Sequence, residues 1–307
     1  MLQYLRSTTN NLAIKQTEAL IPGTWVRSEK PTDAEKLALI DLGVDEDILT
    51  DALDPHEVPR VEPEDGWTYF ITRLPDTDDD FNDFTTPILF AMSSEYLVTV
   101  SRDSLGRLWQ PFIDAGPVSS TSEQTRIFMH MMEAIMRQYQ RRIATINRQM
   151  RAATSDVQRL ESKDISTLSE YERKLNDYLD ALIPTNTATE KLLSGRMLKL
   201  TEDDRDQVED LSIDLEQLIA RCKSLLRTIT NLRDSYRAVM DTRLNETIRL
   251  LTVITLALTI PTMMAGLYGM NVELPGHVES SPFTFWGVVG ISLLRAGSLS
   301  IYFLRKR

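Results

Sequence analysis

Four threonines in an uncharged stretch near the end of the chain share one helical face. The stretch reads LLTVITLALTIPTMMAGL, residues 250–267, and holds Thr252, Thr255, Thr259 and Thr262 at spacings of three, four and three residues. Such spacings place side chains on one side of an α-helix. Hydroxyl and carbonyl oxygens suit a hard, hydrated cation. The stripe therefore predicts a pore, whereas threonines bonded only to their own backbone would merely pack helices together.

Two apolar segments are long enough to cross a bilayer. Residues 250–267 carry no charge, and residues 282–304, PFTFWGVVGISLLRAGSLSIYFL, carry only Arg295. Segments of about 18 or more apolar residues are typical transmembrane helices. The short loop at residues 268–281 makes the two spans a hairpin with both flanks on one side. Because two helices cannot enclose a water-filled path, a pore requires several copies of the chain around a symmetry axis.

The distribution of basic residues predicts the orientation. Arg243 and Arg249 precede the first span, and the tail at residues 305–307 is wholly basic, whereas the loop contains Glu273 and Glu279 and no Lys or Arg. Positive flanks stay in the cytoplasm. The start, MLQYLRSTTNN, lacks the apolar core of a signal peptide. We expect a multi-pass plasma-membrane protein with both termini cytoplasmic.

Composition excludes several function classes. The chain has 307 residues and a net charge of -11, which would repel nucleic acid. A single cysteine, Cys222, excludes a disulfide scaffold and a cysteine zinc site. An enzyme is disfavoured because His56, His130 and His277 are far apart in the sequence, and we find no phosphate loop or nucleophile motif.

The first part of the chain, residues 1–120, has the pattern of a cytoplasmic α/β domain. Thr32 and Glu35 form a capping box before an apolar helix that Gly43 ends. Strands are predicted at WTYFITR, PILFAM and YLVTVS, residues 67–73, 87–92 and 96–101. The acidic run DTDDDFND at residues 76–83 lacks EF-hand spacing, so it predicts a solvated turn rather than a Ca²⁺ loop.

The next part, residues 121–249, predicts a stalk of long helices. One pattern begins at EQTRIFMHMM, a second covers SEYERKLNDYLDALI, and a third begins near Asn186 and continues into the first span. The absence of Pro and Gly between Gly195 and Pro261 allows one unbroken helix of about 100 Å. Its heptad-like apolar positions indicate packing in a bundle or an oligomer.

Directly after the first span, the residues Tyr268, Gly269, Met270 and Asn271 precede a short acidic loop, a second span and a basic terminus. In this position the Gly-Met-Asn signature resembles that of the CorA family of magnesium channels, and the resemblance extends over the whole chain. It implies an α+β membrane protein: an N-terminal α/β cytoplasmic domain, long stalk helices and two C-terminal transmembrane helices per subunit. It also implies a funnel-shaped homopentamer with the first span lining the pore.

The resemblance further implies roles for individual residues. Gly269, Met270 and Asn271 would form the outer mouth, where amide oxygens contact the water shell of Mg²⁺, an ion that loses water reluctantly. Glu273 and Glu279 would concentrate cations by their field. Ile248 and Leu251 would form a hydrophobic gate, Thr262 an inner ion site and Asn245 the cytoplasmic end. The full set of pore-lining positions would be Asn245, Ile248, Leu251, Thr255, Thr259, Thr262 and Gly266.

The family is closed by intracellular Mg²⁺ bound between neighbouring cytoplasmic domains. The matching carboxylates here are Asp51, in DILTDALDPHEVPRVE, and Asp210 on the stalk helix, with Asp234 similar to a second stalk carboxylate. Metal between Asp51 and Asp210 of adjacent subunits would offset their repulsion and favour the closed ring. Solvated surface charge is the alternative for each aspartate.

Two features depart from the family pattern. Asn271 is followed by VELPG with His277 in the same loop, and Arg295 interrupts a span that is usually apolar. The leading function is a channel for Mg²⁺, with Co²⁺ and Ni²⁺ also carried, driven by the membrane potential. Zn²⁺ transport, coupled to protons, is the alternative within the family. A membrane-anchored helical scaffold for a protein partner is the alternative from another class, although a simple anchor needs no threonine stripe.

Overall fold

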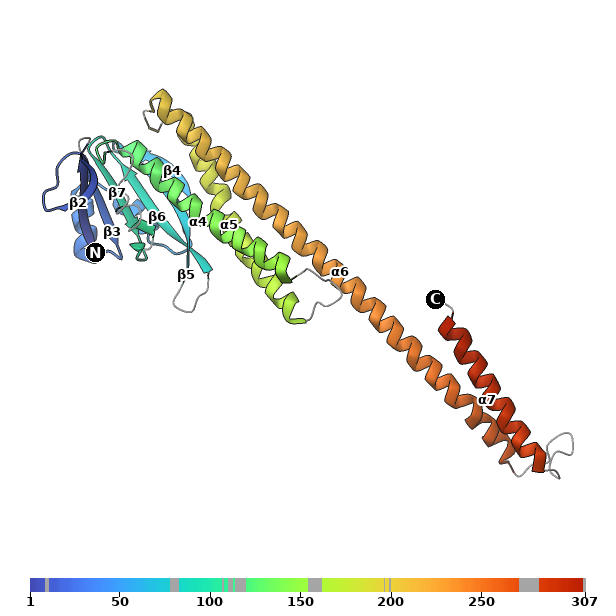
Figure 1. Cartoon of the computed structure of the whole chain (residues 1–307). Helices are drawn as coiled ribbons and strands as arrows, with labels where there is room; N and C mark the ends of the chain where they lie inside the picture. Colours follow the sequence, from blue (N-terminus) through green and yellow to red (C-terminus); the bar gives the residue numbers. More distant parts are fainter. Residues whose placement is uncertain are drawn as a thin grey trace. The chain divides into compact units, whose positions relative to one another are not determined.

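The protein forms two compact units, Met1–Leu232 and Arg233–Arg307. The computed structural model describes residues 1–8, 11–77, 83–106, 108–109, 113, 120–153, 162–195, 197–198, 200–270 and 282–305. Helix α6, Glu202–Tyr268, contributes residues to both units (Figure 1).

A seven-stranded mixed sheet is the centre of the first unit. The strands are β1 (Leu2–Thr8), β2 (Asn11–Thr17), β3 (Thr24–Glu29), β4 (Arg60–Glu64), β5 (Trp67–Thr77), β6 (Asp83–Met92) and β7 (Tyr96–Ser101). Their order is β2-β1-β3-β7-β6-β5-β4, with β3 and β7 parallel and all other pairs antiparallel. The three strands predicted from the sequence are confirmed as β5, β6 and β7, and β5 and β6 are longer than predicted. The other four strands were not predicted.

Both faces of the sheet are buried, which explains the continuous apolar runs in its central strands. On one face Phe70 and Phe90 pack against Phe128 of helix α4 (Gln124–Ala153), with ring centroids 5.1 and 5.2 Å apart. On the other face Tyr69 and Ile71 join the cluster of α1 (Asp33–Asp41) and α2 (Glu46–Asp51). The period-two alternation of strand side chains thus supplies two cores.

Local capping determines where the two short helices begin. The predicted capping box is confirmed: the Thr32 hydroxyl accepts from the Glu35 amide, and the Glu35 carboxylate accepts from the Thr32 amide at 2.9 Å. Hydrogen bonds accepted by the Glu35 carboxylate, led by the one from the Thr32 amide, lower the pKa of Glu35. Gly43 follows α1 with a φ of 101°, as its predicted capping role requires. Asp45 caps α2, and Asp51 is the last residue of that helix.

The second and third helical patterns meet at a different place from the one predicted. Helix α5, Ser162–Leu193, continues through Pro184 and includes Asn186, so a third helix does not begin there. Proline removes one backbone hydrogen-bond donor from the helix. The next residue, Thr185, is buried, and its hydroxyl lies 2.8 Å from the hydroxyl of Thr72 on β5, so a tertiary contact holds the helix in place here. Helix α6 begins only after Thr201, whose hydroxyl accepts from the Asp204 amide at 3.2 Å.

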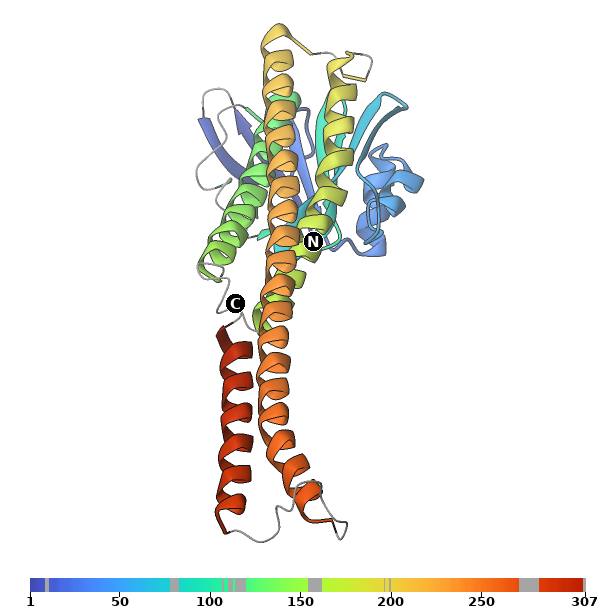
Figure 2. The same cartoon turned by 90° about the vertical axis from the view of Figure 1, so that its right-hand side faces the viewer.

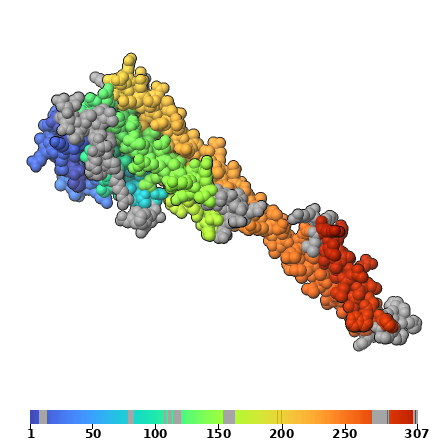
Figure 3. All heavy atoms as spheres, in the orientation of Figure 1, coloured from blue at the N-terminus to red at the C-terminus, as the bar shows by residue number. Residues whose placement is uncertain are grey.

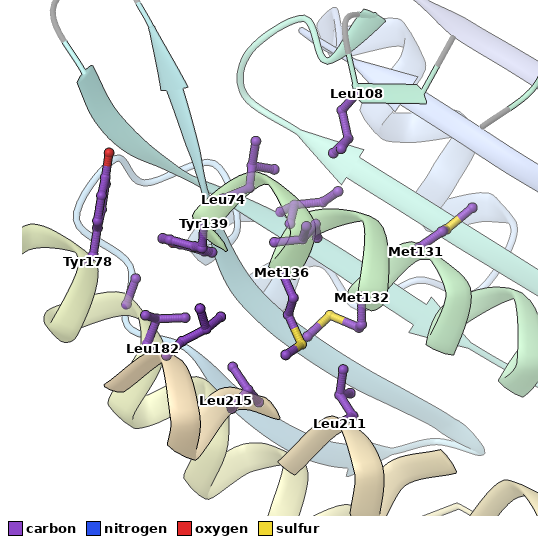
Figure 4. Packing of buried hydrophobic residues seen from close by; sticks show 14 of the residues in the cluster. Leu74, Leu108, Met131, Met132, Met136, Tyr139, Tyr178, Leu182, Leu211 and Leu215 are labelled. Carbon is purple, nitrogen blue, oxygen red and sulfur yellow. The ribbon is translucent and has the colours of Figure 1, made fainter. Parts of the chain in front are cut away.

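The first half of α6 has one buried stripe that packs on the first unit. Its buried residues recur every three or four positions, and they are Val208, Leu211, Leu215, Leu218, Cys222, Leu225 and Ile229. Leu211 and Leu215 point toward Met132 and Met136 of α4 (Figure 4). Burial raises the pKa of Cys222 to about 12, so this thiol is an inert packing residue. The heptad-like pattern is therefore a packing seam within one chain.

Candidate functional site

The second unit is an antiparallel pair formed by the C-terminal part of α6 and helix α7, Pro282–Arg305 (Figure 2). The Arg249 guanidinium near the start of the pair donates to the Phe303 carbonyl near its end, with Nε 3.0 Å from the oxygen. Val253 of α6 and the small residues Ser292 and Ala296 of α7 are buried at this contact, and α7 covers one side of α6 (Figure 3). Small residues allow close helix approach in a membrane.

Apart from this seam, the apolar surface of the hairpin is uncovered. Both helices are long and apolar enough to span a membrane, and only 6% and 11% of their most apolar windows are buried. Side chains as large as Phe283 and Leu294 are 84% and 74% exposed. Exposed apolar surface of this extent requires lipid or further copies of the protein.

The threonine stripe occupies the face of α6 that α7 leaves free. Thr255, Thr259 and Thr262 are exposed, whereas Leu256, Ile260 and Met264, on the side of Val253, are less exposed. At about 100° per residue these two sets lie on opposite sides of the helix. Ile248 and Leu251 are 52% and 64% exposed and precede the threonines on the same face. Asn245 and Gly266 are exposed as well.

Each threonine hydroxyl in the stripe is oriented by its own helix. The hydroxyls of Thr255, Thr259 and Thr262 donate to the carbonyl four residues earlier at 2.8, 2.7 and 2.8 Å, and Thr252 does the same at 2.9 Å. Donation directs each hydrogen inward and leaves the oxygen lone pairs outward. The face therefore presents acceptors, which can contact a cation or the hydrogens of its water shell.

The C-terminal turns of α6 are shaped by Pro261 and Gly269. Pro261 supplies no backbone donor for the carbonyl of Ala257, and α6 bends toward its C-terminal end (Figure 2). The Gly269 amide donates to the Ala265 carbonyl at 2.9 Å, and a Cβ at this position would lie only 3.1 Å from that oxygen. Glycine thus lets the helix close tightly at the signature. Met270 is 54% exposed.

Several predicted residues lie outside the described part of the chain. They are Asn271, Glu273, His277 and Glu279. Arg295 is described: it lies on α7, and its side chain is exposed. Among the described residues it forms no ion pair.

Asp51 is bound to an arginine that the sequence analysis did not single out. The Arg60 guanidinium contacts three carboxylates: Nη2 lies 2.8 Å from Asp51, Nε lies 3.1 Å from Glu62, and Nη1 contacts Glu57. The Asp51 side chain is still 52% exposed. The single arginine among four acidic residues between positions 51 and 62 was the available signal for this cluster.

Asp210 lines a groove between α4 and α6 with a volume of about 700 Å³. The charged residues of the groove are Glu133, Arg137, Asp210, Asp214 and Arg221. Asp210 is exposed, and within the described residues its carboxylate forms no ion pair.

The other acidic predictions have different environments. Asp234 is paired with Arg237 at 3.6 Å, one turn along α6. Asp83, at the end of the acidic run, contacts Arg142 and lies 3.2 Å from the ammonium of Lys174, so this carboxylate is paired rather than solvated. The turn predicted for the run falls on residues 78–82, which lie outside the described part of the chain. Among the residues whose positions are described, no group of three or more His, Cys, Asp or Glu could hold a metal ion.

The structure joins a sheet unit and its long helices to two helices long and apolar enough to span a membrane, and comparison with known proteins assigns the chain to a class of membrane transport proteins. Residues 23–307 match the family described as CorA-like Mg²⁺ transporter protein. The chain therefore belongs to the CorA family of Mg²⁺ and divalent-cation transporters.

Two curated relatives are similar over most of the chain. The cobalt/magnesium transport protein CorA of Methanocaldococcus jannaschii is 24% identical over 88% of this chain and 86% of its own length. The magnesium transport protein CorA of Salmonella typhimurium is 22% identical over 99% of this chain and 98% of its own. The complete structure of the M. jannaschii CorA magnesium transporter superposes with a TM-score of 0.84 and 20% identity, covering 100% of this chain and 98% of that one. The subunit fold predicted from the signature, a soluble domain with long helices and two C-terminal spans, thus matches the fold of a solved CorA chain.

Proposed function

We propose that this chain is one subunit of a homopentameric channel that admits Mg²⁺ down the membrane potential. The observation that carries the proposal is the exposed, oxygen-bearing face of α6 opposite the α7 seam. A ring of copies with this face inward would give a polar path, and the lipid-exposed surface would then be α7 and the flanks of α6. The name of the M. jannaschii relative supports Co²⁺ as a second substrate, and Ni²⁺ is proposed with it.

The chemistry of the path suits a hydrated ion. Mg²⁺ gives up its water ligands reluctantly, so a ring of Asn271 amide oxygens would select the ion by contacting its water shell. Glu273 and Glu279 would raise the local concentration of Mg²⁺ by their field. Further in, the lone pairs of Thr262, Thr259 and Thr255 accept from those waters. Gly266 leaves room for them on the same face. No carboxylate lies among these stripe positions, which keeps the ion hydrated and mobile.

The gate is proposed at the cytoplasmic end of the stripe. Ile248 and Leu251 of every copy would form an apolar ring, and a narrow apolar ring excludes water and therefore hydrated ions. Asn245 would mark the cytoplasmic exit.

We propose that the protein is in the plasma membrane with both termini in the cytoplasm. Arg243, Arg249 and Arg305 flank the hairpin on one side, which supports this orientation. The sheet unit would then sense internal ions.

Regulation is proposed to act through Asp51 and Asp210 of adjacent subunits, with Asp234 as a second stalk carboxylate. Carboxylate oxygens on exposed side chains are the ligands that Mg²⁺ takes, so the residues present fit the ion. The Asp51 cluster carries three carboxylates and one guanidinium, and the Asp210 groove carries three carboxylates and two guanidinium groups. Both surfaces are net negative and repel each other. A divalent cation between them removes that repulsion and favours the closed ring.

Flux into liposomes containing the purified protein tests the function. We expect Mg²⁺ influx that follows an imposed potential and falls when Mg²⁺ is placed on the side of the sheet unit. Flux of Zn²⁺ alone, tied to a pH gradient, would assign the chain to zinc transport. No flux of any divalent cation from correctly assembled protein would contradict a transporter and favour the scaffold.

Neutralising Asp51 and Asp210 together is expected to weaken closure by internal Mg²⁺. Loss of two carboxylate ligands, each contributing about 1.5–3 kcal/mol in a charged contact, should raise the half-inhibitory Mg²⁺ concentration at least about tenfold. Flux measured against internal Mg²⁺ for Asp51→Asn/Asp210→Asn gives the shift. Asp214→Asn, in the same groove, is the matched control and should shift it less. An unchanged inhibition curve in the double variant would refute the assignment.

A further inference from the structure

The guanidinium of Arg60 is fully committed to carboxylates of its own chain. Its three nitrogens contact three different acids, Asp51, Glu57 and Glu62, and the side chain is only 32% exposed. Arginine presents its donors in a rigid planar fork, which suits such an arrangement. The bond to Asp51, at 2.8 Å, is as short as a good charge-assisted hydrogen bond.

Both ends of the Arg60–Asp51 pair are held by secondary structure. Arg60 is the first residue of β4, and its Cα is paired with Ile71 of β5. Asp51 ends α2, a helix anchored by the buried Ile48 and Leu49 and capped by Asp45. Because neither backbone is a loose terminus, the pair is preorganised, and the entropic cost that weakens most surface pairs is reduced.

We propose that Arg60 competes with Mg²⁺ for Asp51 and thereby sets the internal Mg²⁺ concentration at which the channel closes. This inference rests on the proposed role of Asp51 and specifies how that site is regulated. A carboxylate oxygen that accepts from a guanidinium has fewer lone pairs for a metal and faces a positive charge beside the metal position. Mg²⁺ must therefore weaken the Arg60 bond before Asp51 can bridge to Asp210 of a neighbouring copy.

The neighbouring acidic residues lower the free-energy cost of breaking the Arg60–Asp51 bond. Glu57 and Glu62 share the same guanidinium, so Arg60 retains two partners when Asp51 turns to the metal. The positive charge of Arg60 therefore stays paired with Glu57 and Glu62 after Asp51 leaves. The energetic difference is therefore that of one partly exposed pair, which corresponds to a change of about fivefold in a binding constant.

The test measures Mg²⁺ binding by a readout other than flux. The full-length protein in detergent is digested with trypsin across a Mg²⁺ series, and the Mg²⁺ concentration that gives half-maximal protection is recorded. Arg60→Gln is expected to lower this midpoint about fivefold, because Asp51 is released. Arg60→Lys keeps the charge but cannot serve three carboxylates, so we expect a smaller shift in the same direction. Arg227→Gln, an exposed arginine elsewhere on α6, should leave the midpoint unchanged.

Asp51→Asn separates failure of this inference from failure of the proposed site. Loss of Mg²⁺ protection in Asp51→Asn together with a lowered midpoint in Arg60→Gln supports the competition. Loss of protection in Asp51→Asn with an unchanged or raised midpoint in both Arg60 variants overturns it and leaves the proposed metal site standing. Unchanged protection in Asp51→Asn overturns both. Size-exclusion profiles that match the parent protein confirm folding, and Arg60→Lys decides the question if Arg60→Gln does not fold.

Discussion

Replacing Asn271 by alanine is expected to abolish Mg²⁺ uptake while the protein still assembles. The proposed mouth selects the ion by contacts between amide oxygens and its water shell, and each contact to a charged group contributes about 1.5–3 kcal/mol. Because every subunit of a homo-oligomer carries the substitution, the whole ring of amides is lost. Uptake at a fixed potential should therefore fall at least about 100-fold.

The measurement is Mg²⁺ flux into liposomes, with the oligomer size determined in detergent for the same preparation. Asn176→Ala is a matched control, because Asn176 is an exposed asparagine on α5 in the first unit. It should leave flux unchanged. Retained uptake in Asn271→Ala would contradict the role of the amide ring, whereas loss of the oligomer would show a structural role instead.

The long, strongly patterned elements of the fold could be predicted from the sequence. The apolar spans, the Thr32–Glu35 capping box and the three most apolar strands each carry a local signal that the structure confirms. The hairpin of β4 and β5 also had such a signal, Asp65-Gly66, with φ values of 47° and 83° at its turn. This turn signal predicts a strand just before it, which is β4, although the apolar pattern alone does not.

The first two strands and the boundary between α5 and α6 depend on tertiary contacts. β1 and β2 have seven residues each and mix polar with apolar side chains, and β1 is paired with both β2 and β3. Pro184 indicates a helix end by its local chemistry, but Thr185 and Thr189 of the next turn are buried against the first unit. Packing of that turn stabilises the helix beyond the proline. Local propensity alone could not give this result.

For the candidate site, the sequence identified individual residues but not which of them contact each other or which helix face stays uncovered. The spacing of the threonines predicted a common face, and the structure adds that α7 leaves this face free. Arg60 is the single arginine near Asp51 in the sequence, but which acidic residues it contacts depends on the turn between α2 and β4, and the sequence alone does not give that turn. The small residues Ser292 and Ala296 recur every four positions in α7 and were a usable signal for the seam.

Replacing Leu251 by asparagine is expected to give a channel that internal Mg²⁺ no longer closes. Leu251 is 64% exposed on the free face of α6, and an apolar ring at this level would block ions by excluding water. An amide there holds water in the ring, and the change in transfer free energy exceeds about 1.4 kcal/mol per side chain. Flux at saturating internal Mg²⁺ should therefore rise at least about tenfold.

Leu250→Asn is the matched control for this prediction. Leu250 is 54% exposed, and it is rotated by about 100° from Leu251, away from the stripe. The same amide placed there should leave Mg²⁺ suppression intact, because it does not enter the apolar ring. Full suppression in Leu251→Asn would move the constriction away from this level of the helix. Loss of suppression in both variants would mean that polarity anywhere in this turn disturbs the spans, and the gate would then have to be sought by substitutions at Ile248.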